Sequence, residues 1–184
     1  MAFRIFCFLI ATFPVWAADV AGVKFEERAR VAESELALKG AGLRRRAFFQ
    51  VYAIGLYVQD RKADAMTQQG PKRVLIHMLR DVGADTFTQA LAEGIRDNHT
   101  EPDAKALEPR VKELANAIAT IGEAKKGMAI ALDWNGRATQ LVVEGKPVAA
   151  PIAGEDFYRA LLRIWLGEKP VQDDLKKALL GAAP

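Results

Sequence analysis

Residues 48–58, FFQVYAIGLYV, place the strongest single constraint on the fold of this 184-residue chain. Aromatic and β-branched residues of this kind are typical of a β-strand, and the segment is long enough to cross a sheet. Regular alternation would put Tyr52 and Ile54 on one face of the strand and Tyr57 on the other. The chain must therefore build a sheet in which this segment is a long strand.

The segment GAGLR at positions 40–44 places Arg44 shortly before that strand. Arginine stays protonated at physiological pH, and its planar guanidinium group fits a carboxylate in a bidentate pair. The hydroxyl group of Tyr52 could donate one more hydrogen bond to the same carboxylate. This pair favours a cleft for an anionic head and an apolar tail. The alternatives are a structural ion pair for Arg44 and a core position for Tyr52.

The N-terminal residues 1–18 have the layout of a secretory signal peptide. Arg4 is the only charged residue before Asp19, residues 5–14 are almost wholly apolar, and Ala17 or Ala18 would precede the cleavage point. A buried N-terminal helix is the alternative. The apolar stretch is shorter than the roughly 20 residues of a membrane span, so no stable span is expected after cleavage. We expect a mature domain at 19–184 that is periplasmic or secreted.

Few residues of the mature chain could bind a metal ion or carry redox chemistry. Cys7 is the only cysteine and lies in the expected signal peptide, so disulfides and thiolate sites are excluded. His77 and His99 are the only histidines, too few for a histidine-rich metal site. A pairing of His77 with a nearby aspartate stays open. The net charge of +3 comes from basic residues that are mostly scattered, which does not indicate a nucleic-acid surface.

Hydrophobic periodicity predicts strands at both ends of the mature chain and helices in the middle and at the C-terminus. The expected strands lie at 22–25, 34–38 (running into a Gly-Ala-Gly turn), 73–79, 128–134, 139–143 and 147–149. Asn135-Gly136 favours a two-residue hairpin turn. The expected helices lie at 60–69, at 85–98, after an N-cap at Asp103, and along apolar stripes at 157–165 and 175–179. The pattern predicts an α+β domain with a mainly antiparallel sheet.

The chain resembles the chalcone isomerase-like proteins, in their bacterial exported branch. Three motifs carry the resemblance: GAGLR at 40–44, VYAIGLY at 51–57, and the tail IWLGEKPV at 164–171 with DLK at 174–176. Their order and spacing extend over most of the mature chain. The resemblance implies an open-faced, mainly antiparallel sheet backed by a layer of α-helices, with a ligand cleft between them.

The family contains plant enzymes that cyclise chalcones and members that bind fatty acids or have no known catalysis. Arg44 matches an arginine that polarises the substrate in the enzymes. Tyr52 stands where the enzymes have threonine and the fatty-acid-binding members have tyrosine. The stretch 82–94 has neither the tyrosine nor the asparagine of the enzymes, and the loop after Arg44 is shorter. These departures count against chalcone cyclisation, so we expect no catalytic residues, and the expected binding function requires no cofactor and no metal.

We predict a monomeric protein that binds a small apolar carboxylate, such as a fatty acid. The expected binding residues are Arg44, Tyr52, Ile54, Phe87 and Leu91. Phe87 and Leu91 lie on the apolar stripe of the helix at 85–98, which would simply be core in the alternative interpretation. Two other functions stay open. One is an isomerase or lyase that acts on a phenolic or enone substrate, and the other is an envelope protein-interaction module whose cleft is filled by its own side chains.

Overall fold

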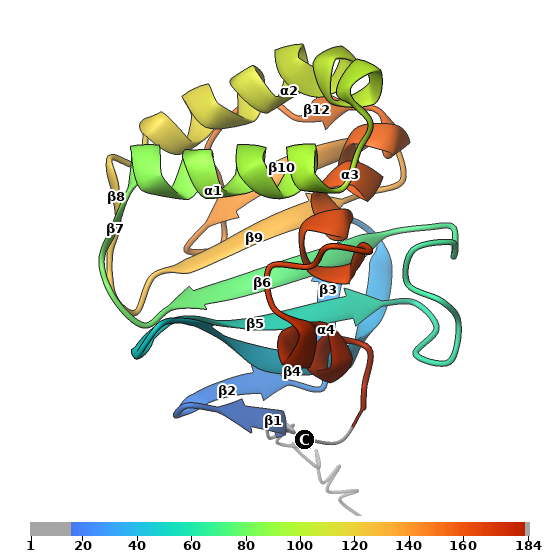
Figure 1. Cartoon of the computed structure of the whole chain (residues 1–184). Helices are drawn as coiled ribbons and strands as arrows, with labels where there is room; N and C mark the ends of the chain where they lie inside the picture. The colour runs from blue at the N-terminus through green and yellow to red at the C-terminus, as the bar shows by residue number, and fades with distance from the viewer. Residues whose placement is uncertain (1–15, 183–184) are drawn as a thin grey trace, which may run out of the picture.

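A curled antiparallel sheet forms the centre of the computed structural model, which describes residues 16–182 (Figure 1). The strand order in the sheet is β11-β10-β9-β6-β5-β4-β3, and β12 pairs with β10. The strands are β3 (Arg28–Val31), β4 (Ser34–Arg46), β5 (Phe49–Val58), β6 (Lys72–Met78), β9 (Ala129–Trp134), β10 (Ala138–Val143), β11 (Lys146–Pro147) and β12 (Ile152–Ala153).

The helices lie on one face of this sheet (Figure 1). Between β6 and β9 the chain forms α1 (Ala84–Asp97) and α2 (Glu101–Ala119), and it ends with α3 (Glu155–Leu166) and α4 (Asp173–Leu179). Two short antiparallel pairs complete the fold: the hairpin of β1 (Trp16–Val20) with β2 (Val23–Glu26), and β7 (Val82–Gly83) with β8 (Glu123–Ala124), which lie on either side of α1 and α2 in the chain. The predicted α+β class, with an open antiparallel sheet backed by helices, is confirmed.

Strict alternation along β5 divides the core into two clusters. Tyr52, Ile54 and Leu56 pack toward the helices, whereas Ala53 and Tyr57 pack on the opposite face. There the β1–β2 pair covers the sheet, and the Tyr57 hydroxyl donates to the carbonyl of Glu26 at 3.1 Å. The predicted division of this strand into two faces is correct. Within residues 16–182 no helix is both long enough and apolar enough to cross a membrane.

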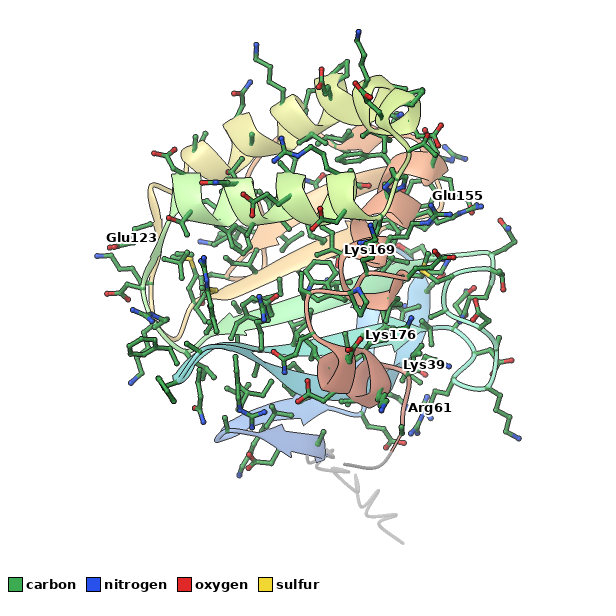
Figure 2. The ribbon with its side chains drawn as sticks, in the orientation of Figure 1. Lys39, Arg61, Glu123, Glu155, Lys169 and Lys176 are labelled. Atoms are coloured by element: carbon green, nitrogen blue, oxygen red, sulfur yellow. The ribbon has the colours of Figure 1, made fainter. Side chains whose placement is uncertain are left out.

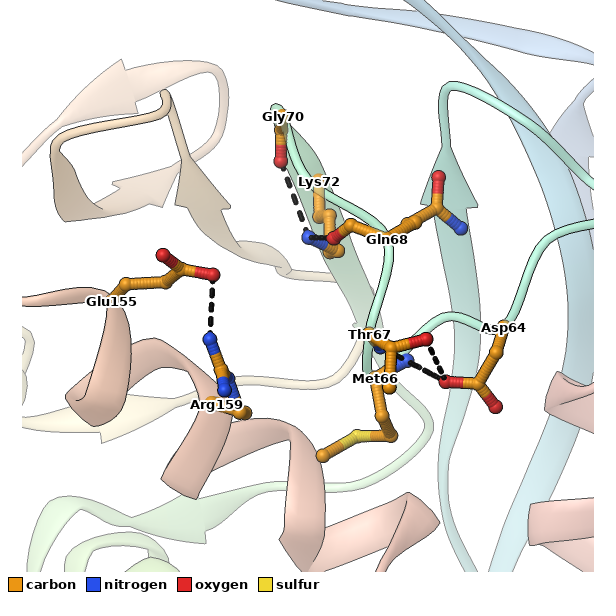
Figure 3. A network of polar contacts seen from close by, with 8 residues as sticks. All are labelled: Asp64, Met66, Thr67, Gln68, Gly70, Lys72, Glu155 and Arg159. Atoms are coloured by element: carbon orange, nitrogen blue, oxygen red, sulfur yellow. Dashed lines mark hydrogen bonds and ion pairs between the residues drawn. The ribbon is translucent and has the colours of Figure 1, made fainter.

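The predicted helix at 60–69 is wrong, because this segment is a loop between β5 and β6. Asp64 Oδ1 accepts hydrogen bonds from the backbone N–H groups of Met66 and Thr67, both at 2.9 Å (Figure 3). An aspartate that bonds its own backbone in this way offers the chain an alternative to the helical hydrogen bonds. The Lys72 ammonium group then fastens the loop to β6 by donating to the carbonyls of Gln68 and Gly70 (Figure 3).

Three further expectations about local structure differ from the observed chain. The N-cap of α2 is Thr100, whose hydroxyl accepts from the N–H of Asp103, so Asp103 lies within the first turn. The hairpin register pairs Trp134 with Thr139, and the Asn135 N–H donates to the carbonyl of Ala138 at 3.3 Å, so the two residues at the tip are Gly136 and Arg137 rather than Asn135 and Gly136. The Gly-Ala-Gly segment is no turn but the interior of β4.

Most of the expected signal peptide lies outside the described residues. The expected cleavage point after Ala17 or Ala18 falls within β1, which begins at Trp16.

Candidate functional site

The GAGLR motif lies on β4, with α4 packed directly against it. Gly40 and Gly42 face α4, and a Cβ atom built on Gly42 would meet Leu175 Cδ1 at 2.7 Å and Ala178 Cβ at 2.9 Å. A Cβ atom on Gly40 would overlap the backbone carbonyl of Ala178. The motif therefore needs glycine at both positions because the helix approaches the strand more closely than any side chain allows.

The close approach of α4 lets its N-cap residue, Gln172, bind the backbone of β4 around Arg44. Gln172 Nε2 donates to the carbonyl of Leu43 at 3.0 Å, and Gln172 Oε1 accepts from the backbone N–H of Arg45 at 2.8 Å. Gln172 Oε1 also accepts from Arg44 Nη1 at 3.3 Å. The glycines, the helix and the arginine are thus parts of one arrangement, in which α4 fixes the strand segment that presents Arg44.

Arg44 has no carboxylate partner among residues 16–182. Besides its contact with Gln172, Arg44 Nη1 donates to the carbonyl of Arg45 at 2.6 Å, and the neighbouring ion pair with Asp174 is made by Arg45 instead. The structural ion pair that competed with a ligand role for Arg44 is therefore not found in this part of the chain. A half-buried guanidinium group without an anion is well suited to receive one.

Tyr52 lies directly opposite Arg44 in the pairing of β4 with β5. Its side chain is 9% exposed, and its hydroxyl oxygen accepts a hydrogen bond from the Trp165 indole nitrogen at 3.0 Å. Burial raises the pKa of Tyr52 above its ordinary value, while the indole N–H and the charge of Arg44 act in the opposite direction. The phenol is therefore protonated at neutral pH.

The hydroxyl hydrogen of Tyr52 has no acceptor within the described chain. The other described tyrosines differ, since Tyr57 donates to the carbonyl of Glu26 and Tyr158 to that of Leu132. Tyr52 thus has a proton to donate on the side that its partner Trp165 does not occupy. Arg44 and Tyr52 together offer a cation and a neutral donor from adjacent strands.

Both residues line a cleft of about 820 Å³ between the sheet, α1 and the segment that follows α3. Clefts of roughly 300–1,000 Å³ are the usual size for small-molecule sites. Phe87 and Leu91 of α1 also line the cleft, although they are only 7% and 6% exposed. The remaining apolar lining comes from Ala47, Phe49, Val51, Val82, Ala90, Ile164, Trp165, Pro170 and Val171. Side chains of residues 16–182 do not fill the cleft.

Ile54 lies outside this cleft. It is 0% exposed and borders a separate void of only about 10 Å³ beneath Trp165. The structure thus brings together four of the five predicted residues, Arg44, Tyr52, Phe87 and Leu91, and places the fifth one layer deeper in the core.

The rim of the cleft carries more basic than acidic side chains. Its cationic members are Arg44, Arg46, Arg80 and Lys169, and its acidic members are Asp81, Glu93 and Asp97. Lys169 lies between α3 and α4, on the helical side of the sheet (Figure 2). Asn98 holds this segment in place, because its side chain donates to the carbonyl of Lys169 and accepts from the Lys169 N–H.

Other groups offer no comparable site. His77 packs edge-on against the ring of Phe25 on the face opposite the cleft, so it forms no pair with the aspartates near α1. A groove of about 280 Å³ between α2 and α3 contains Arg110, but Asp156 already neutralises it in a bidentate pair. In the described part of the chain no group of three or more His, Cys, Asp or Glu residues could hold a metal ion.

Sequence reasoning missed the two residues that support the site from behind, Trp165 and Gln172. Trp165 lies at the end of the expected apolar stripe at 157–165, and its hydrogen bond to Tyr52 joins residues 113 positions apart. Gln172 lies next to the tail motif at 164–171, but nothing in the spacing connects it with Arg44, 128 positions away. The tail motif was the one available signal, because it marks the segment that bears both residues.

Comparison with known proteins gives one family and one fold. The model of a family described as chalcone isomerase-like matches residues 17–181. A crystal structure of a fatty-acid binding protein from Arabidopsis thaliana matches with a TM-score of 0.66 and 15% sequence identity, covering 87% of this chain and 92% of that chain. At this identity the likeness shows the fold. No curated protein sequence matches the chain.

Proposed function

This chain belongs to the chalcone isomerase-like family, and on that premise we propose that its cleft binds a small apolar carboxylate such as a fatty acid. One observation carries the proposal: an arginine without an anionic partner lies beside a buried tyrosine hydroxyl with a free hydrogen, at the surface of an open apolar cleft. A carboxylate supplies the missing charge and the missing acceptor together.

The tail of such a ligand would lie along the apolar lining from Tyr52 toward Phe87 and Leu91. Each methylene group that leaves water contributes about 0.8 kcal/mol. Affinity should therefore rise with chain length until the tail reaches the end of the cleft. The 15%-identical Arabidopsis protein is a fatty-acid binding protein, which agrees with this ligand class.

The experiment that tests this function is native mass spectrometry of the purified protein with saturated fatty acids of increasing length. We expect one bound fatty acid per chain and clearly weaker binding of the alcohol of equal length. Ala90→Trp should reduce binding about 10-fold or more, because Ala90 lines the cleft and an indole would occupy the space of the tail. Gln89→Trp introduces the same side chain at the neighbouring exposed position outside the cleft.

Equal binding to the Ala90→Trp and Gln89→Trp variants would place the ligand elsewhere and contradict the proposed site. Turnover of a chalcone above the buffer rate, with no fatty acid bound, would favour the isomerase or lyase function instead.

We further propose that the protein is exported to the periplasm or secreted, on the strength of the signal-peptide layout at residues 1–18. Expression of the full chain in a bacterial host should yield a mature protein that begins at Ala18 or Asp19. The intact mass checks this directly. A product that retains residues 1–17 in the membrane or cytoplasm would contradict export.

A further inference from the structure

The turn between β4 and β5 (Figure 1) leads into β5 with two consecutive exposed aromatic residues, Phe48 and Phe49, here called the aromatic pair. Phe48 is 100% exposed and Phe49 is 59% exposed, while Leu180, at 39%, is the other exposed large apolar side chain in the described chain. Turns of this kind usually carry Gly, Asn, Asp or Pro. Here Ala47 takes the left-handed position, with φ of 52°, and two phenylalanines follow it. Transfer of the two rings from water to an apolar partner would lower the free energy.

Basic side chains surround the aromatic pair. Arg45 and Arg46 precede it and are exposed, and the guanidinium carbon of Arg80 lies 4.6 Å from the centroid of the Phe49 ring. Among residues 16–182, only Arg45 of these three arginines has an acidic partner, an exposed Asp174 carboxylate at 3.7 Å. At such an exposed position the pair contributes little and can be exchanged for another anion.

Asp81, the acidic residue next to Arg80, forms a hydrogen bond with a neighbouring loop. Asp81 accepts a hydrogen bond from the backbone N–H of Lys126 at 2.7 Å, which draws the loop with Lys125 and Lys126 to this end of the sheet. Around the exposed rings, the three arginines Arg45, Arg46 and Arg80 outnumber the two carboxylates of Asp81 and Asp174.

From these contacts we propose that residues 45–49 together with Arg80, here called the docking tip, bind the surface of an anionic lipid bilayer. Aromatic rings suit the headgroup region, and each basic side chain near an anionic membrane adds to the attraction. A tip of about six residues is too small for a stable protein partner, which needs about 800 Å² on each side. A bilayer accepts a small tip because it deforms around the inserted rings.

The docking tip is continuous with the mouth of the cleft. Arg46, Ala47, Phe49 and Arg80 belong to both. A docked molecule would therefore open its cleft toward the lipid headgroups, where an acyl carboxylate could pass between bilayer and protein. This exchange step rests on the proposed ligand function, whereas the docking itself does not.

Vesicle co-sedimentation of the purified mature protein tests the docking. We expect binding to vesicles of equimolar phosphatidylcholine and phosphatidylglycerol, little binding to phosphatidylcholine alone, and release at high salt. Phe48→Ser should weaken binding to the anionic vesicles about 10-fold. The substitution cannot disturb the core, since the side chain has no burial to lose.

Leu180→Ser is the matched control, because it removes the other exposed large apolar side chain and should leave vesicle binding unchanged. Failure of the wild-type protein to bind anionic vesicles would overturn the proposal, as would equal binding by Phe48→Ser. Binding of dissolved fatty acid by Phe48→Ser should remain at the wild-type level. This second readout separates a failure of docking from a failure of the ligand function.

Discussion

Gly40→Ala is expected to lower the free energy of unfolding by about 3 kcal/mol. The new methyl group would overlap the carbonyl oxygen of Ala178 in α4, and the carbonyl of Leu179 lies beside it at 2.8 Å. Both obstacles are backbone atoms, so no side-chain rotation can relieve the contact. Either α4 leaves the strand or β4 bends away from it.

The consequence extends to the site, because α4 carries Gln172 at its N-terminus. If the helix is displaced, the hydrogen bonds from Gln172 to Leu43, Arg44 and Arg45 are lost. Chemical denaturation measures the loss of stability, and the ligand affinity of the fraction that stays folded should fall with it. Gly40 is thus required for the position of Arg44 as well as for the fold.

Gly83→Ala is the matched control for this substitution. The backbone φ of Gly83 is −62°, and an added Cβ would meet no atom within 4 Å. Since Gly83 is the N-cap of α1, a cost of up to about 1 kcal/mol is expected from capping alone. If Gly40→Ala were as mild as Gly83→Ala, the close packing of α4 on β4 would not exist in solution.

The faces of β5 could be predicted from the sequence because they depend only on the two-residue period of a strand. Tyr52 and Ile54 point one way and Tyr57 the other for that reason alone. The amphipathic stripes of α1, α3 and α4 were predictable on the same ground, since the helical period repeats locally. Phe87 and Leu91 line the cleft because their stripe faces the sheet.

The failures arose where contacts distant in sequence decide the structure. Gly40 and Gly42 look like a turn locally, yet they form the interior of a strand because a helix from the C-terminus packs on them. Ile54 has the right face but the wrong depth, which alternation cannot distinguish. In the loop at 59–71, the side chain of Asp64 outweighed a weak helical pattern through its own backbone bonds.

Arg44→Gln should reduce the affinity for fatty acids about 10- to 100-fold, the largest expected effect on the proposed function. Hydrogen bonds to charged groups contribute about 1.5–3 kcal/mol to binding. The Arg44 guanidinium group is the cation that lies opposite Tyr52 in the pairing of β4 with β5. Glutamine is the substitution of choice, since its amide can still donate to Gln172 and to the carbonyl of Arg45. Isothermal titration with a fatty acid and with the alcohol of equal length measures the effect.

The alcohol separates an anchor from a merely structural arginine. If Arg44 binds the carboxylate, Arg44→Gln removes the preference for acid over alcohol and leaves alcohol binding unchanged. If Arg44 only shapes the cleft, both ligands weaken by the same factor, and the anchor role fails. Arg137→Gln makes the same change of charge in the β9–β10 turn, at the opposite end of the strands from Arg44. The affinity of Arg137→Gln for the fatty acid should equal that of the wild-type protein. If the attraction came from overall charge alone, the affinity would fall equally in both variants.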